Sequence, residues 1–174
     1  LRRHFHQNPE IAWDEVETSK RVAEELKKIG CENIRIGFGG TQCGVSADII
    51  GGKGGKCIAL RADIDALPLQ DEKDAPYRSQ KAWVMHACGH DGHTAMLLGA
   101  AKILMSLKAD LKGKVRLLFQ PAEEHATRSG GKAMIDDGAL EGVDDAFGIH
   151  VYPSLPTGQF QYRFGPFMAA SARW

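Results

Sequence analysis

The segment from Gly92 to Lys108 constrains the fold of this chain more than any other part of its sequence. Its residues, GHTAMLLGAAKILMSLK, are apolar on nearly every side of a helix. A helix of this kind is expected to be buried between a sheet and other helices. Short apolar runs typical of strands lie on both sides of it, at 56–63 and 114–120. Strands that alternate with helices indicate an α/β layer fold that contains parallel strands.

Further segments fit the same architecture. We expect helices at 13–30 and 130–138, and strands at 33–38, 44–50, 146–152 and 158–164. Glycines bound the first two of these strands, and the two are expected to pair antiparallel. The sequence therefore predicts one α/β domain without internal repeats.

The charge balance limits the classes of partner that we expect, and the cysteine pattern indicates the cellular compartment. Lysine plus arginine equals aspartate plus glutamate at 22 each, so we expect no nucleic-acid partner. No apolar run approaches the ~18 residues of a membrane span, so we expect no membrane partner. The cysteines are Cys31, Cys43, Cys57 and Cys88. They lack paired short spacings, which favours a reducing, cytoplasmic compartment, and the first three are expected to be buried as small hydrophobes.

Three of the strand-like runs end abruptly in polar residues. These residues are Asp63, the neighbours Glu123 and Glu124, and His150. Ligands of open α/β sheets bind outside the carboxyl ends of the strands, so we expect these residues to converge. The loop VMHACGHDGHT, which precedes the apolar helix, adds Cys88, His90 and Asp91 to the same rim. For Asp63 and Asp65, a role as turn residues before Pro68 stays an equal alternative.

These residue types indicate a metal centre. Thiolate, imidazole and carboxylate together are the ligand set of zinc and its first-row neighbours. Cys88 and His90 on a loop, completed by residues from strand ends, are typical of a catalytic site assembled by the fold. Neighbours on a turn point in different directions, so one of Glu123 and Glu124 can bind metal while the other takes a proton from metal-bound water. The pattern therefore predicts hydrolysis.

Four other histidines carry weaker signals. His86 and His93 each have two readings, as metal ligands or as groups that hydrogen-bond a ligand or cap the helix. His4 and His6 are expected to be partly exposed and outside the site, because no carboxylate cluster adjoins them in the sequence.

Four motifs, in this order and at these separations, resemble one family. They are RADIDALP, MHACGHDGHTAMLLGAAKIL, FQPAEE and GIHVYPSLPTG. The family is that of the metal-dependent amidohydrolases, with hippurate hydrolases, aminoacylases, indole-acetyl-amino-acid hydrolases and archaeal carboxypeptidases. The resemblance implies a three-layer, zinc-exopeptidase-like domain with a mixed, largely parallel central sheet flanked by helices. It also implies two divalent cations, zinc or manganese most often, with cobalt and nickel as alternatives.

The resemblance assigns roles position by position. The implied metal ligands are Cys88, His90, Glu124 and His150. Glu123 would be the general base, and Asp63 and Asp91 would support ligands without touching metal. The implied reaction is hydrolysis of the amide bond of an N-acyl amino acid or of a C-terminal peptide bond, a small-molecule substrate in either case.

The resemblance also implies that residues 1–174 are part of a catalytic domain. The inserted dimerisation and lid domain, and the remainder of the catalytic domain, would lie outside this sequence, and the full-length parent would be a homo-oligomer. Two other functions stay open at this point. One is a cysteine hydrolase with Cys88 as the nucleophile, and the other is a metal-binding fragment without activity.

Overall fold

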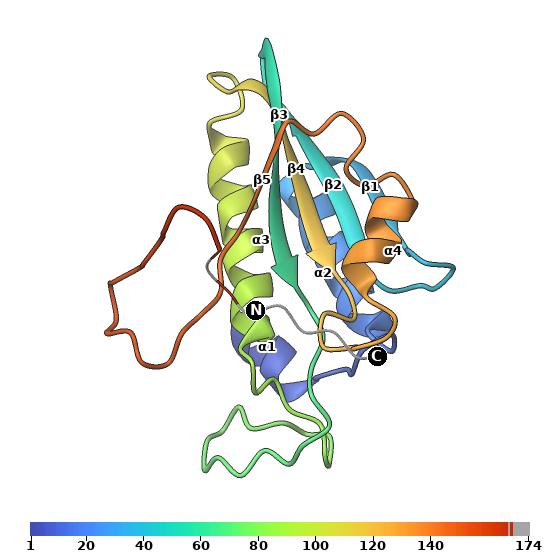
Figure 1. Cartoon of the computed structure of the whole chain (residues 1–174), viewed down its shortest axis with the longest axis vertical. Coiled ribbons are helices and arrows are strands. Elements are labelled where there is room, and N and C mark those ends of the chain that lie inside the picture. Colours follow the sequence, from blue (N-terminus) through green and yellow to red (C-terminus); the bar gives the residue numbers. More distant parts are fainter. Residues whose placement is uncertain (167, 169–174) are drawn as a thin grey trace.

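The computed structural model describes residues 1–166 and 168 and has the predicted α/β architecture (Figure 1). In chain order its elements are α1 (Arg2–Gln7), α2 (Val16–Ile29), β1 (Glu32–Ile36), β2 (Val45–Ile50), β3 (Lys53–Asp63), α3 (His90–Ser106), β4 (Lys112–Gln120), α4 (Gly130–Asp136) and β5 (Asp145–Gly148). Two expected strands differ: the last described strand ends at Gly148, and residues 158–164 are not strand.

The central sheet is mixed, with strand order β1-β2-β4-β3-β5. Strand β2 is antiparallel to both of its neighbours, β1 and β4, whereas β3 is parallel to both β4 and β5. The expected antiparallel pairing of the first two strands is therefore confirmed. The three parallel strands are contiguous, so their carboxyl ends lie along one edge of the sheet.

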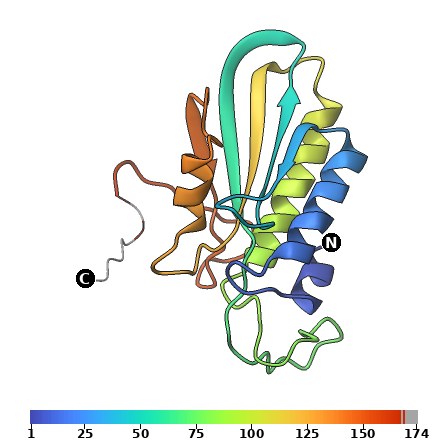
Figure 2. The same cartoon turned by 90° about the vertical axis from the view of Figure 1, so that its right-hand side faces the viewer.

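Helices cover both faces of the sheet, which gives three layers (Figure 2). Helices α1, α2 and α3 lie on one face, and α4 lies on the other. Helix α2 ends at Gly30, whose φ of 94° is the left-handed conformation that glycine adopts without strain. The predicted three-layer fold with a mixed sheet is thus present.

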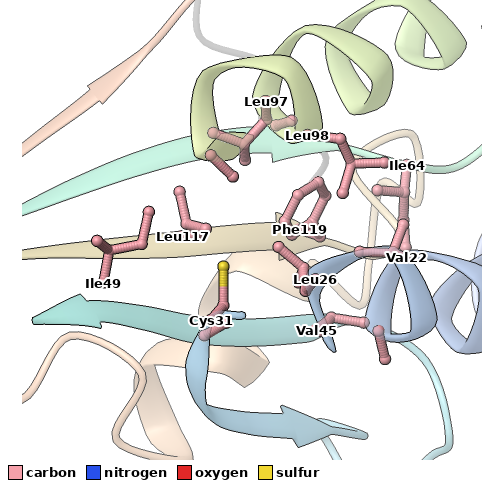
Figure 3. Packing of buried hydrophobic residues seen from close by; sticks show 14 of the residues in the cluster. Val22, Leu26, Cys31, Val45, Ile49, Ile64, Leu97, Leu98, Leu117 and Phe119 are labelled. Atoms are coloured by element: carbon pink, nitrogen blue, oxygen red, sulfur yellow. The ribbon is translucent and has the colours of Figure 1, made fainter. Parts of the chain in front are cut away.

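The main core lies between the sheet and the layer of α2 and α3. Figure 3 shows buried side chains from α2, α3, β2 and β4 in mutual contact. Val22 and Leu26 of α2 are both 0% exposed, as expected for the inner face of an amphipathic helix. As predicted, the three cysteines other than Cys88 are buried.

Helix α3 is less completely covered than its sequence predicts. Leu98 and Ala101 are buried against the core, but Met96 is 47% and Ile103 is 63% exposed. Met96 and Ile103 lie two turns apart on the same side of α3, and this side is partly open to solvent in the described part of the chain.

The expectation for His6 is wrong. Its side chain, on the short helix α1, is 0% exposed. The His6 Nδ1 lies 2.8 Å from Asp91 Oδ2, and Nε2 lies 3.2 Å from Asp71 Oδ2. The carboxylates come from residues 85 and 65 positions away, so local sequence could not reveal them. His4 is exposed, as expected.

We predict that His6→Ala lowers the free energy of unfolding by about 3 kcal/mol. The substitution leaves the buried carboxylates of Asp71 and Asp91 without the imidazole that both of them contact. Urea denaturation measures the effect, and His4→Ala on the same helix is the control, with an expected change below about 0.5 kcal/mol. Equal midpoints for the two variants would contradict a stabilising role for the His6 contacts.

Candidate metal centre

The carboxyl edge of the parallel strands gathers the predicted site residues. Asp63 ends β3, while Glu123 and Glu124 follow β4 and His150 follows β5. The structure brings these residues together with Cys88 and His90. Three groups have ligand atoms within 4.8 Å of one another: Cys88, His90 and His150; Asp63, His90 and His93; and His90, Glu123 and Glu124.

His90 occupies the centre of this cluster. It is the first residue of α3 and is 0% exposed. Its Nδ1 donates to Asp65 Oδ1 at 3.0 Å, whereas its buried Nε2 has no hydrogen-bond partner among the described residues. That free nitrogen lies 3.8 Å from Glu124 Oε1 and 3.9 Å from Glu123 Oε2. An imidazole held by a carboxylate at one nitrogen and free at the other fits a metal ligand.

Cys88 and His150 lie beside His90 in this cluster. Cys88 Sγ lies 3.3 Å from His150 Nε2. The residue between Cys88 and His90 is Gly89, with a φ of 87°, and a Cβ there would collide with Val151. Glycine therefore allows the segment around His150 to approach the start of α3 closely.

The two glutamates lie at a bend where the chain turns after β4. The N–H of Glu124 donates to Asp65 Oδ2 at 2.9 Å, so Asp65 holds both His90 and this turn. Burial raises the pKa of Glu123, and the charges of Asp63 and Glu124 raise it further. A carboxylate with a raised pKa accepts a proton more readily near neutral pH, which suits a general base.

The sequence allows His93 to be either a metal ligand or a supporting group, and its contacts favour the supporting role. Its Nδ1 donates to Asp63 Oδ1 at 2.5 Å, and its Nε2 accepts from the N–H of Val151 at 2.9 Å. Both ring nitrogens are therefore engaged. Burial by itself would raise the pKa of Asp63, but the bond from His93 and the charges of His90 and Arg61 outweigh it and lower the pKa to about 2. Asp63 is thus an anion that orients His93.

The hydrogen bonds of Asp91 differ from expectation, and His86 lacks the hydrogen bonds of a supporting group. The Asp91 carboxylate bonds with His6 and with Arg2 Nε at 2.7 Å, not with a ligand imidazole, and no side-chain hydrogen bond caps α3. His86 is 4% exposed, and neither of its ring nitrogens has a partner among the described residues. Burial lowers the pKa of His86 to about 4, so its ring is neutral at pH 7.

Sequence reasoning missed Glu15 and left Asp65 undecided. Glu15 precedes α2 and is 0% exposed, and its Oε1 accepts from the N–H of Ala122 at 2.7 Å. Ala122 directly precedes Glu123, so Glu15 helps to hold the turn that carries Glu123 and Glu124. The contact spans 107 residues, and no sequence motif signals it. For Asp65, the signal was its place two residues beyond the end of β3.

The buried carboxyl of Glu15 should make the free energy of unfolding depend on pH. Burial raises its pKa from 4.5 to about 7, so the folded chain prefers the protonated carboxyl. The stability gained from this proton is complete below pH 4.5 and is lost as the pH rises through about 7. Glu15→Gln, neutral at every pH, should therefore gain about 3 kcal/mol over the unsubstituted protein between acidic and alkaline pH. Urea unfolding at both extremes measures this difference, and a difference independent of pH would contradict it.

The electrostatic surroundings of the Cys88 thiol are unlike those of a catalytic nucleophile. Burial and the negative charges of Glu124, Glu123 and Asp63 raise the pKa of the thiol to about 12. Catalytic cysteines have lowered pKa values and electropositive surroundings. A thiol among imidazoles and carboxylates is the donor set that zinc and related cations prefer. The residues present therefore fit a divalent cation.

The fold and this donor set place the chain among three-layer α/β proteins that have a cluster of potential metal ligands at the carboxyl edge of the sheet. The chain belongs to Peptidase family M20/M25/M40, whose sequence profile matches residues 59–169. This membership confirms the resemblance seen in the four motifs.

Individual relatives extend the match over nearly the whole chain. Thermostable carboxypeptidase 2 of Saccharolobus solfataricus is 49% identical over 169 residues, which are 97% of this chain and 42% of that protein. N-acetyl-L-cysteine deacetylase of Bacillus subtilis is 47% identical over 174 residues, which are 100% of this chain and 41% of that protein. The chain thus spans less than half the length of these relatives.

A solved structure confirms the fold. The crystal structure of the Bacillus subtilis YXEP protein, described as a dinuclear metal binding peptidase of the M20 family, superposes with a TM-score of 0.84 at 44% identity. The match covers 90% of this chain and 42% of that one. Among the residues that the structure describes, no helix combines the length and apolar composition needed to cross a membrane.

Proposed function

We propose that the complete protein containing this chain is a metal-dependent hydrolase of amide bonds. Its substrates would be N-acyl amino acids or short peptides cleaved at the C-terminal bond, both small molecules. The observation that carries the proposal is the buried, unpartnered Nε2 of His90, which faces the carboxylates of Glu123 and Glu124. The relatives named as a carboxypeptidase and a deacetylase support this choice of reaction.

The proposed ligand set has four members. They are Cys88, His90, Glu124 and His150. The dinuclear neighbour supports two divalent cations in the complete site, and we propose zinc or manganese, with cobalt or nickel as alternatives. When bound, the cations would act as Lewis acids that polarise the amide carbonyl and acidify water.

Glu123 is the proposed general base. Its side chain is 40% exposed, compared with 25% for Glu124, so it is the more accessible of the two to water and substrate. Its carboxylate would take a proton from the attacking water and deliver it to the departing amine. Asp65 would hold His90 and the turn in place, while Asp63 would act through His93.

We also propose that residues 1–174 form only part of the catalytic domain. All four residues of β5 are exposed, Phe147 among them at 59%, and Ile149 directly after the strand is 73% exposed. Further sequence that packs against this edge strand would cover them and bring the remaining ligands, so residues 1–174 alone should bind metal weakly and hydrolyse poorly. The complete protein would be a cytoplasmic homo-oligomer with a separate dimerisation domain.

Metal analysis and a substrate panel on the complete protein test this function. The panel contains N-acetyl and N-benzoyl amino acids and dipeptides, each followed by release of the free amino acid. We expect bound divalent metal and turnover of at least one of these substrate classes. A metal-loaded protein that hydrolyses none of them would contradict the proposal.

A further inference from the structure

Glu15 is a buried carboxyl that has no part in the proposed chemistry. Its side chain is wholly buried at the start of α2. One oxygen, Oε1, accepts from the N–H of Ala122, and the other, Oε2, has no partner within residues 1–166 and 168. Burial of a carboxyl with an unpaired oxygen lowers stability, so the reason for its presence should lie at the far end of its single hydrogen bond to the turn.

The far end of that bond is a strained residue. Ala122 is 0% exposed and has a φ of 47°, a left-handed conformation that residues other than glycine rarely adopt. Its carbonyl accepts from the N–H of Gly130 at 3.2 Å. Without Glu15, the N–H of Ala122 would be a buried donor without an acceptor, and the strained turn would lose its main restraint.

Glu123 lies between two backbone anchors. On its amino side, Glu15 holds the N–H of Ala122, and on its carboxyl side Asp65 holds the N–H of Glu124 at 2.9 Å. No hydrogen bond within the described residues holds the side chain of Glu123, whose Oε2 lies 3.9 Å from His90 Nε2. The backbone of the turn therefore fixes the direction of the Cα–Cβ bond from which the Glu123 carboxylate extends.

We propose that Glu15 is a positioning residue that holds the Ala122–Glu123 peptide so that the Glu123 carboxylate faces the metal centre. The inference rests on the proposed function, in which Glu123 is the general base. Because Glu124 has its own anchor at Asp65, loss of the Glu15 bond should disturb the base and leave the metal ligands in place.

The test uses the complete metal-loaded protein. Glu15→Met removes the acceptor at similar volume and should lower kcat at least about tenfold, with KM and metal content within about twofold of the starting values. Glu15→Gln keeps an oxygen at the Oε1 position and should stay within about threefold of the original kcat. Misplacement of a base acts on turnover more than on binding, so the kcat and KM split separates positioning from general destabilisation.

Glu10→Met is the matched control. Glu10 is also a buried carboxyl near the start of α2, but its oxygens accept from the N–H groups of Glu17 and Thr18 and not from the turn. Its replacement should lower the melting temperature, because two N–H groups lose their acceptor, and kcat should stay within about twofold. If Glu15→Met fails to fold, Glu15→Asp replaces it, because a carboxylate shorter by one methylene cannot reach Ala122.

Two results would overturn the inference. Equal kcat values for the Glu15→Met and Glu10→Met variants would show that Glu15 is only structural. Loss of metal in step with kcat would show that it supports the ligands and not the base. A parallel Glu123→Gln variant separates these failures from failure of the proposed function, since full turnover by that variant would remove the base role itself.

Discussion

Replacement of Glu123 by glutamine is expected to lower kcat of the complete protein by about 100-fold or more. Glutamine keeps the shape of the side chain but cannot take a proton from water. The side chain of Glu123 has no hydrogen bond to other described residues, so the substitution should leave the fold and the metal ligands unchanged. Substrate affinity and metal content should therefore stay near their original values. Steady-state kinetics and metal analysis of the same preparation measure all three quantities.

Glu124→Gln is the matched control for this experiment. The two residues are neighbours on one turn, and the proposal gives them different tasks. Loss of a carboxylate ligand should lower bound metal as well as turnover, whereas loss of the base should lower turnover alone. The opposite outcome, with metal lost from the Glu123→Gln variant only, would exchange the two roles. Full turnover by the Glu123→Gln variant would exclude Glu123 as the base.

The sequence predicts the sheet and its functional edge because both depend on local patterns. Glycine boundaries mark β1 and β2, and the apolar runs of β3 and β4 are long enough to be recognised. Polar residues at the ends of such runs predict a site at the carboxyl edge, since parallel strands bring those ends together. Residues 158–164 have a strand-like pattern without a strand in the structure, because strand formation needs a partner edge as well as a pattern.

The sequence predicts the role of a site residue where its chemical type decides that role. It does not predict the role where the direction of the side chain decides it. His90 and Asp91 are consecutive on α3, so their side chains project about 100° apart around the helix axis. His90 faces the strand ends while Asp91 faces α1, where His6 and Arg2 contact it. The sequence alone does not show which neighbour each of these two side chains faces around the axis of α3. The role of Glu15 is not predicted either, because its partner Ala122 follows β4 and lies 107 residues away in the sequence.

Removal of metal is the second large effect that we expect. Dialysis of the complete protein against a chelator should abolish hydrolysis, and zinc or manganese should restore it, because Cys88, His90, Glu124 and His150 would hold the cations that polarise the substrate. Measurement of turnover before dialysis, after dialysis and after each metal is returned provides the comparison. Activity that survives complete removal of metal would favour the cysteine hydrolase with Cys88 as nucleophile.

Alkylation of Cys88 separates these two functions further. The pKa of this thiol is raised to about 12, so the metal-free protein should react slowly with iodoacetamide. A bound cation would convert the thiol to a coordinated thiolate and shield it, so mass spectrometry should find still less alkylation at Cys88 after metal is restored. The other three cysteines are buried and serve as internal references. In the metallohydrolase, alkylation of the metal-free protein should prevent recovery of activity by metal, because one proposed ligand is blocked. In a cysteine hydrolase, alkylation would instead abolish an activity that needs no metal, so the order of the two treatments distinguishes a ligand from a nucleophile.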